Sequence, residues 1–168
     1  MTSASSRAHD ISRLFVLCER IEAAHAGMYR TLAEIHRTYP TISALWRKTA
    51  QDEERHAAQF RLAAAGYASA VTSVSIDLAQ VTKLLQSVEE TALRIRQQSL
   101  TVPEALQLAI SMEEVLANLH LDQVAEFSEP RVKRLFSAMM SADGKHVQAL
   151  RDALQVWEEP DEPKEQLA

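Results

Sequence analysis

The sequence predicts an all-α protein, an antiparallel four-helix bundle in which a long crossover carries an extra helix. The chain of 168 residues contains only 3 Gly and 5 Pro, so turns are scarce and long uninterrupted helices are favoured. Apolar residues also recur at helical spacing in five separate segments. A composition that is 46% hydrophobic and 24% charged is typical of a folded globular protein. We expect one domain over residues 1–157 and an acidic, proline-rich tail over residues 158–168, disordered or lying on the surface.

The first two predicted helices form an antiparallel pair. One runs from about Ser6 to Arg37, and Tyr39-Pro40 interrupts it because proline disfavours helical backbone in the preceding residue. The second helix follows directly and ends near Gly66, so the short connection places the two side by side. Their inward positions are Ile11, Leu14, Phe15, Cys18, Ile21, Met28, Leu32 and Ile35, then Ile42, Leu45, Trp46, Thr49, Phe60 and Ala63.

Three further helices are predicted in the rest of the chain. A crossover of about ten residues, rich in Ser, Ala and Val, leads to a covering helix over about residues 78–95. Thr101-Val-Pro-Glu104 has the pattern of a capping box, so a fourth helix is expected from there to Phe127. Ser128-Glu-Pro130 ends it, and a fifth helix extends to Trp157. The inward positions of the fourth and fifth helices are Leu106, Ala109, Leu116, Val124 and Phe127, then Val132, Leu135, Phe136, Met139, Leu150 and Trp157.

The two helical pairs resemble each other in sequence. At an offset of 90 residues, Leu45-Trp46 matches Leu135-Phe136, Glu53 matches Asp143 and His56 matches His146, and Glu22 matches Glu113 at an offset of 91. The chain therefore reads as a duplicated helix pair with a long crossover between the copies. This is the connectivity of ferritin-like four-helix bundles.

Four acids interrupt the apolar faces near the middle of their helices: Glu22, Glu53, Glu113 and Asp143. In an antiparallel bundle, mid-helix positions on the inward faces meet at one level, so these carboxylates should converge. Unpaired buried carboxylates are prohibitively costly, and cations must therefore lie between them.

Two histidines follow two of these acids by three residues, His56 after Glu53 and His146 after Asp143. Three residues return a helix nearly to the same face, so each acid and imidazole can hold one metal ion together. Four carboxylates match the charge of two divalent cations, and each histidine adds one nitrogen. Di-iron and di-manganese bundles use this arrangement of two Glu and two Glu-x-x-His motifs.

The segments ERIEAAHAGMY, DEERH, AISMEE and ADGKH resemble the rubrerythrin-type di-iron proteins of the ferritin-like superfamily, over about residues 10–155. The resemblance implies two Fe ions as cofactors, although Mn or Zn would fit the spacing too. It implies that Glu22 and Glu113 are terminal carboxylate ligands and that Glu53 and Asp143 bridge the ions. His56 and His146 are then the nitrogen ligands.

The sequence departs from this family in three places. It has one cysteine, whereas the rubredoxin-like domain of rubrerythrins has four, so the electron donor is expected to be external. Peroxide-reducing rubrerythrins carry an extra carboxylate three residues after the ligand of the third bundle helix, where this chain has Leu116. Asp143 is one methylene shorter than the usual Glu, which a shift of the fifth helix or monodentate binding would compensate.

Other polar residues have less support as ligands. Glu19 and Glu114 neighbour the chosen acids, but the duplication does not match them to acids. Tyr29 and His120 follow Glu22 and Glu113 by seven residues and either donate a hydrogen bond to a carboxylate or pack in the core. Three further histidines complete the set: His25 is either a core histidine or a site residue, and His9 and His36 are expected at the periphery. Cys18 is expected only to pack.

We expect a di-iron oxidoreductase of the peroxidase or ferroxidase type that reacts with peroxide or dioxygen. The alternatives are an iron-binding or storage module without turnover and a metal-free helical scaffold. A net charge of −5 disfavours nucleic acid as a partner. The absence of long apolar runs and of a signal peptide in the sequence disfavours membrane insertion and export, and the single Cys18 fits a cytoplasmic location. A homo-oligomer, a dimer, is expected.

Overall fold

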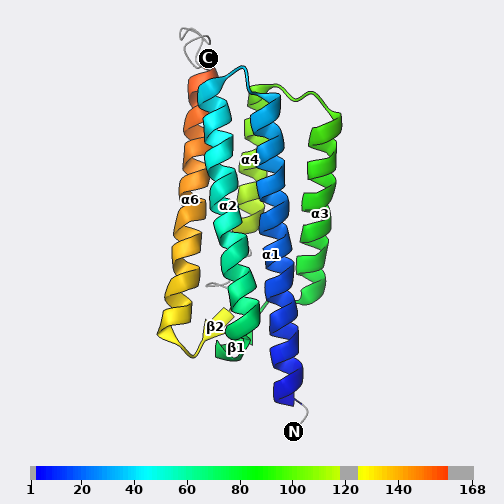
Figure 1. Ribbon diagram of the computed structural model, residues 1–168, viewed down its shortest axis with the longest axis vertical. Helices are drawn as coiled ribbons and strands as arrows, with labels where there is room; N and C mark the ends of the chain where they lie inside the picture. The colour runs from blue at the N-terminus through cyan, green and yellow to red at the C-terminus, as the bar shows by residue number, and fades with distance from the viewer. Residues whose placement is uncertain (1–2, 118–124, 159–168) are drawn as a thin grey trace.

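Five α-helices account for most of the chain in the computed structural model, which describes residues 3–117 and 125–158 (Figure 1). They are α1 (Ser3–Ile35), α2 (Pro40–Gly66), α3 (Leu78–Gln97), α4 (Val102–Ala117) and α6 (Pro130–Glu158). The predicted all-α ferritin-like fold is confirmed. No helix among the described residues combines the length and the apolar composition that a bilayer span requires.

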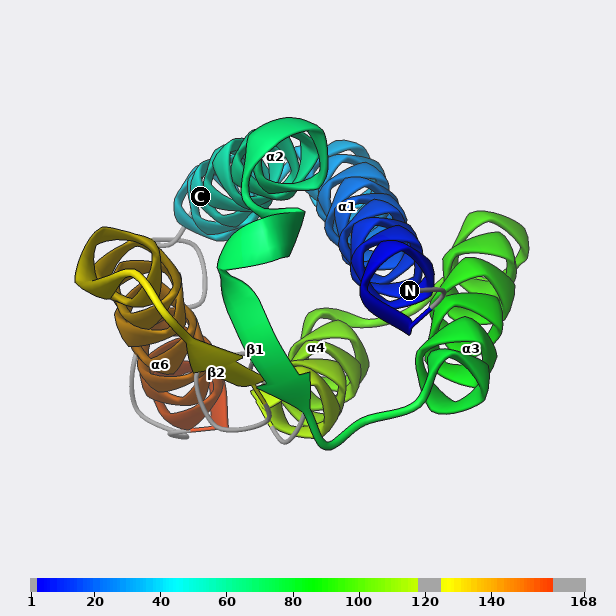
Figure 2. The same cartoon turned by 90° about the horizontal axis from the view of Figure 1, so that it is seen from below.

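Helices α1, α2, α4 and α6 form the four-helix bundle, and α3 lies outside it against α1 (Figure 2). Helices α1 and α2 are antiparallel, as are α4 and α6, whereas α2 and α4 run in the same direction (Figure 1). The chain must therefore return along the full length of the bundle between α2 and α4. Helix α3 makes this return and covers α1 with Val81, Leu85 and Val88, which are buried.

Local hydrogen bonds set the helix starts. Pro40 occupies the first turn of α2, where its missing N–H costs no helical hydrogen bond. At the start of α3, Asp77 Oδ1 accepts a hydrogen bond from the Gln80 backbone N–H at 2.7 Å, and Gln80 Oε1 accepts one from the Asp77 backbone N–H at 3.1 Å. At the start of α4, Glu104 Oε2 accepts hydrogen bonds from the Thr101 hydroxyl at 2.7 Å and from the Thr101 backbone N–H at 2.8 Å, and both lower the pKa of the exposed Glu104. Of the capping box predicted there, the hydrogen bond between the Glu104 side chain and the Thr101 backbone N–H is present, and the Thr101 hydroxyl donates to the same carboxylate.

The expectation that the fourth helix continues to Phe127 is wrong. Within the described residues α4 ends at Ala117, and β2 (Ala125–Phe127) pairs antiparallel with β1 (Val71–Val74) of the crossover. Val124 lies outside the described residues. The apolar spacing toward Phe127 fitted a helix, but the partner strand lies more than 50 residues earlier in the chain and leaves no mark on that spacing. The two strands lie across the lower end of the bundle (Figures 1 and 2).

The core consists of two apolar clusters stacked along the bundle. The lower cluster is built around Phe136, whose ring lies 5.5 Å from Phe15, 5.6 Å from Phe60 and 5.2 Å from Phe127 between centroids. The upper cluster includes Trp46. Between the clusters, α1, α2 and α6 each carry buried polar residues.

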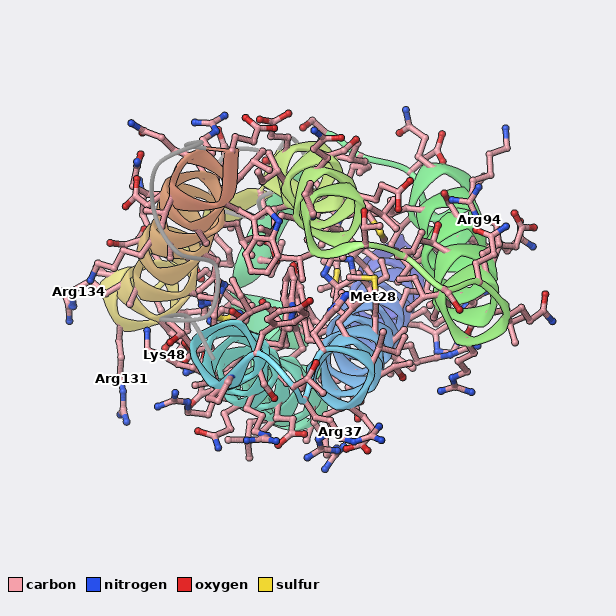
Figure 3. The ribbon with its side chains drawn as sticks, turned by 90° about the horizontal axis from the view of Figure 1, so that it is seen from above. Met28, Arg37, Lys48, Arg94, Arg131 and Arg134 are labelled. Atoms are coloured by element: carbon pink, nitrogen blue, oxygen red, sulfur yellow. The ribbon has the colours of Figure 1, made fainter. Side chains whose placement is uncertain are left out.

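The outer surface carries the cations of the chain. Arg37, Arg94, Arg131 and Arg134 extend away from the helices, whereas Met28 lies in the interior (Figure 3). The bundle therefore has charged residues on its outside and an apolar interior that polar groups interrupt at one level.

Replacing Phe136 by Ala tests the lower cluster. Phe136 is 1% exposed and contacts three aromatic rings, so Phe136→Ala should lower the free energy of unfolding by about 3–5 kcal/mol. Urea denaturation followed by circular dichroism measures the change. Leu93→Ala is the control, because Leu93 is 54% exposed on α3 and should change stability by about 0.5 kcal/mol or less. Equal losses in the two variants would contradict this packing.

Candidate metal centre

Five of the predicted ligands lie in the polar layer between the two apolar clusters. Their ligand atoms form two groups, and within each group all of them lie within 4.8 Å of one another. One group is Glu22, Glu53 and His56, which we call the Glu22 position. The other is Glu53, Glu113 and His146, which we call the Glu113 position. Glu53 belongs to both groups, so its carboxylate lies between the two positions.

The two oxygens of Glu53 face different histidines. His146 Nδ1 lies 3.1 Å from Glu53 Oε1, and His56 Nδ1 lies 3.4 Å from Glu53 Oε2. The two imidazole rings are 6.0 Å apart between centroids. His56 Nδ1 also lies 3.8 Å from Glu22 Oε2. A carboxylate that presents one oxygen to each of two nitrogen donors has the geometry needed to bridge two ions.

Burial and mutual repulsion perturb the carboxylates of this layer. Burial raises the pKa of Glu22 well above its usual range, and the negative charge of Glu53 adds to the rise while His56 partly offsets it. Burial would raise the pKa of Glu53 as well, but hydrogen bonds from His146 and His56 outweigh it and lower that pKa. The two neighbouring acids therefore shift in opposite directions, with the pKa of Glu22 raised and that of Glu53 lowered.

The pKa of His146 is raised, whereas burial ordinarily lowers the pKa of a histidine. Burial by itself would lower its pKa, but the hydrogen bond and the charge of Glu53 outweigh burial and raise it. Protons shared among the acids and imidazoles thus compensate part of the buried negative charge, and divalent cations could take the place of these protons.

Two side chains outside the groups orient ligands at the Glu113 position. Tyr29 Oη donates a hydrogen bond to Glu113 Oε1 at 2.5 Å, so the hydrogen bond to a carboxylate considered for Tyr29 is present. Asp52 Oδ2 lies 3.1 Å from His146 Nε2, and Arg55 forms an ion pair with Asp52. The sequence analysis missed Asp52. The one sequence feature that pointed to Asp52 was its position directly before Glu53 in DEERH. Its partner His146 lies on α6, 94 residues later in the chain.

The remaining candidates lie around the layer. Glu19 and Glu114 form exposed ion pairs with Arg61 at 2.7 Å and Arg151 at 2.6 Å, and they belong to neither ligand group. His25 is fully buried, with its ring edge-on to Tyr29 at 5.9 Å between centroids, and no ligand group among the described residues includes it.

The structure also places four other residues considered in the sequence analysis: Leu116, Cys18, His36 and His9. Leu116 packs against the lower cluster. Cys18 packs there too, and burial raises the pKa of its thiol. His36 was expected at the periphery, but it is buried. Its Nε2 lies 3.0 Å from the Leu100 carbonyl oxygen, in the connection before α4 that covers this side chain. His9 is exposed, as expected.

Two predicted residues lie outside the described part of the chain. Asp143 is on α6, three residues before His146, but its side chain is not among those the structure describes. His120 belongs to the segment 118–124, which lies outside the described residues.

A comparison with protein-family models finds that residues 19–154 match the family Rubrerythrin. The chain belongs to the rubrerythrin family. This is a family of ferritin-like di-iron proteins, and the matched range contains all six predicted ligands of this chain. Searches of curated proteins and of solved structures found no significant match.

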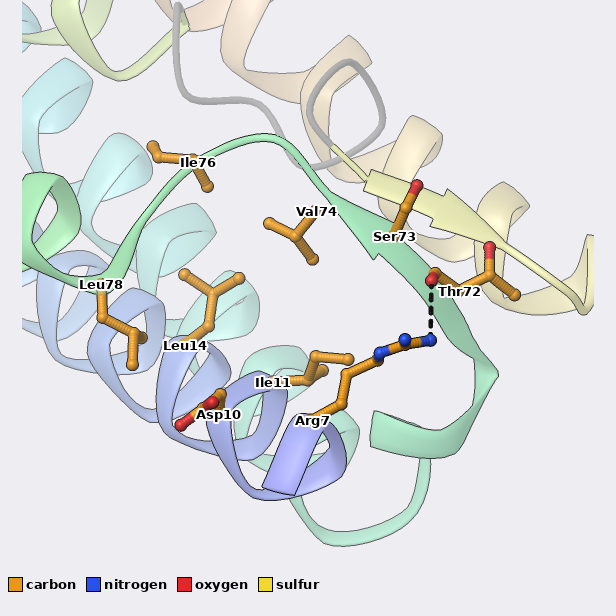
Figure 4. Close-up of a pocket in the computed structure, with 9 residues that line it drawn as sticks. All are labelled: Arg7, Asp10, Ile11, Leu14, Thr72, Ser73, Val74, Ile76 and Leu78. Carbon is orange, nitrogen blue, oxygen red and sulfur yellow. Dashed lines mark hydrogen bonds between the residues drawn. The ribbon is translucent and has the colours of Figure 1, made fainter. Parts of the chain in front are cut away.

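A surface groove of about 540 Å³ lies apart from the rubrerythrin-type ligand groups, between the first turns of α1, β1 and the start of α3 (Figure 4). Arg7 Nη1 reaches across it and donates a hydrogen bond to the Thr72 carbonyl oxygen at 3.5 Å. Ile11 and Leu14 are part of its apolar wall, and Asp10 is the carboxylate among its lining residues. A single acid with no histidine makes this groove a poor metal site.

The stability of the metal-free protein should fall as pH rises from 5 to 8. The raised pKa values of Glu22 and His146 mean that the folded chain holds protons more tightly than the unfolded chain. The stabilisation from Glu22 is lost as pH rises from its ordinary pKa of 4.5 through its raised pKa. The stabilisation from His146 is lost in the same way, starting from its ordinary pKa of 6.5. Glu53, whose pKa is lowered, contributes a constant amount in this range.

Urea denaturation at several pH values in the presence of a chelator measures this dependence. Glu22→Gln removes one titrating group and should make the profile flatter, whereas Glu19→Gln, the control at the surface of the same helix, should leave its slope unchanged. Stability that rises between pH 5 and 8 would contradict the shared-proton interpretation.

Proposed function

We propose that this chain binds two iron ions in the polar layer and reacts with peroxide or dioxygen as a di-iron oxidoreductase of the peroxidase or ferroxidase type. The observation that carries the proposal is the position of Glu53, which presents Oε1 to His146 and Oε2 to His56. Membership of the rubrerythrin family and the two groups of acids and histidines support it.

Each ligand has a separate role in this proposal. Glu22 and Glu113 bind one ion each, and His56 and His146 supply one nitrogen to each ion. Glu53 on α2 would be shared by the two ions, and Asp143, which precedes His146 by three residues on α6, would supply the second shared carboxylate. Four carboxylates and two neutral imidazoles balance the charge of two divalent cations. Oxygen-rich sites with imidazole suit iron and manganese, and zinc also accepts these ligands.

Two Fe(II) ions would supply the two electrons that reduce one molecule of hydrogen peroxide to water. The chain's own residues prepare the site for this reaction. The side chain of Glu53 is 2% exposed and that of Glu22 is 15% exposed, so bulk water is largely excluded from both. Tyr29 and Asp52 hold Glu113 and His146 in fixed orientations.

The electrons for repeated turnover come from a separate donor in this proposal, because the 168 residues contain a single cysteine and cannot form a cysteine-bound iron relay. We place the protein in the cytoplasm as a homodimer. Leu116, where peroxide-reducing rubrerythrins have a carboxylate, supports the second candidate, an iron-binding or storage module that oxidises iron without rapid turnover.

Metal analysis tests the binding part of the proposal. Protein loaded with Fe(II) under anaerobic conditions should hold two ions per chain, and the double variant His56→Ala/His146→Ala should hold fewer than one. Free metal at a hundredfold excess over Kd stabilises the folded state by about 2.7 kcal/mol for one site, so the melting temperature should fall in the variant. His9→Ala, at an exposed histidine of α1, is the control and should match the wild type. Unchanged metal content in the double variant would exclude this site.

Stopped-flow mixing of the Fe(II)-loaded protein with each oxidant tests the reaction. Ferric absorption should develop faster with peroxide than with dioxygen and should stop after one oxidation per loaded site. Further peroxide should be consumed only when a chemical reductant is added. Oxidation without turnover in the presence of reductant would favour the storage function, and no ferric absorption with either oxidant would exclude both redox functions.

A further inference from the structure

Two aromatic side chains that can be oxidised lie on the upper side of the ligand layer. Tyr29 and Trp46 belong to the upper cluster and are fully buried. Below the layer, the rings that contact Phe136 among the described residues are all phenylalanine rings. A phenol or an indole can lose one electron under conditions in which a phenyl ring cannot. The upper cluster therefore places groups with redox chemistry of their own beside the candidate metal centre.

Tyr29 is joined directly to a candidate ligand. Its Oη donates a hydrogen bond to Glu113 Oε1 at 2.5 Å, and both side chains are buried. Loss of an electron makes a phenol strongly acidic, so a tyrosine is oxidised readily only where a base can take its proton. A carboxylate within hydrogen-bond reach is such a base. Glu113 can therefore receive the phenolic proton while Tyr29 gives up an electron, without bulk water taking part.

A stack of rings leads from Tyr29 toward the upper end of the bundle. The rings of Tyr29 and Trp46 lie 5.7 Å apart between centroids, with an angle of 16° between their planes. Trp46 lies 6.5 Å from the His36 ring, and His36 Nε2 is 3.0 Å from the Leu100 carbonyl oxygen. Leu100 belongs to the connection between α3 and α4, whose neighbouring residues are exposed at the upper end (Figure 1). The contacts therefore run from Glu113 to an exposed connection.

We propose that Tyr29 and Trp46 form a one-electron relay between the metal centre and the upper end of the bundle. This inference rests on the proposed function and gives the route by which electrons from an external donor reach the site. Tyr29 passes an electron to the centre and its phenolic proton to Glu113 Oε1, which leaves a neutral tyrosyl radical. Trp46 then passes an electron to this radical, and a proton returns through Glu113. An external one-electron reductant at the upper end restores Trp46.

The relay supplies an electron when the centre can supply only one. Reduction of hydrogen peroxide to two molecules of water takes two electrons and two protons. With one Fe(II) bound, the ion gives one electron and becomes Fe(III), and Tyr29 gives the second electron and, through Glu113, one of the protons. The other proton comes from solvent. The oxidising equivalent is then held on Tyr29 as a radical, and no hydroxyl radical is released.

Freeze-quench electron paramagnetic resonance tests the first step. Protein loaded anaerobically with one Fe(II) per chain is mixed with one equivalent of hydrogen peroxide without reductant. A tyrosyl signal should appear, should narrow when ring-deuterated tyrosine is incorporated, and should be lost in Tyr29→Phe. The chain has 3 tyrosines, so the double variant Tyr39→Phe/Tyr67→Phe retains Tyr29 alone. This variant is the matched control and should keep the signal.

Three results would overturn the relay: ferric iron formed without a tyrosyl signal in the wild type, a signal that persists in Tyr29→Phe, or loss of the signal in the double variant. The double variant decides the assignment even if Tyr29→Phe does not fold. Protein that retains no iron, or that forms no ferric iron with peroxide, would refute the proposed function and the relay with it.

Replacement of Trp46 tests the second step. Trp46→Phe keeps a ring beside Tyr29 but removes the oxidisable indole, so the tyrosyl signal should form and then persist several-fold longer than in the wild type after ascorbate is added. Trp46→Tyr is the matched control, because its phenol can again be oxidised, and its signal should decay at nearly the wild-type rate. Circular dichroism and iron content check that both variants are folded and loaded. Equal decay in the wild type and in Trp46→Phe would exclude Trp46 from the relay.

Discussion

The whole molecule depends on how a layer of carboxylates is accommodated between two apolar clusters. Glu53 and Glu113 are buried in the middle of the bundle, and Glu22 is nearly so. Buried like charges at this spacing repel one another, and the apolar surroundings provide no solvent to screen them. In the metal-free chain the pKa values of Glu22 and His146 are raised, which favours proton binding there, and the histidines lower the pKa of Glu53. The same geometry suits divalent cations.

The topology brings this layer together. Because α2 and α4 run in the same direction, the crossover must travel the length of the bundle, and this brings the middle of all four helices to one level (Figure 1). The apolar clusters above and below fix the helices against sliding, since Phe136 and Trp46 each pack among several rings. The pair β1–β2 closes the lower end, and α3 covers the outer face of α1 (Figure 2).

The two helical pairs match in sequence around the candidate metal centre, but the match is not complete. The chain is a member of the rubrerythrin family in which an apolar Leu116 packs on the lower cluster and in which Asp52 has no acidic counterpart at Ala142. Both positions lie within one helical turn of a predicted ligand, Leu116 after Glu113 and Ala142 before Asp143.

The sequence by itself determined that the fold is helical, most of the helix positions and inward faces, and the candidate ligands, because each follows from residues three, four or seven apart on one helix. Glu-x-x-His spacing and acids within apolar stripes are local patterns of this kind, and so is the capping of α4 by Glu104. Only the tertiary structure decided the pairing of β1 with β2, the burial of His36 and the contact of Asp52 with His146. Each of these depends on how two distant segments are rotated and aligned against each other. Packing of the whole bundle sets that alignment, and no periodicity in the sequence records it.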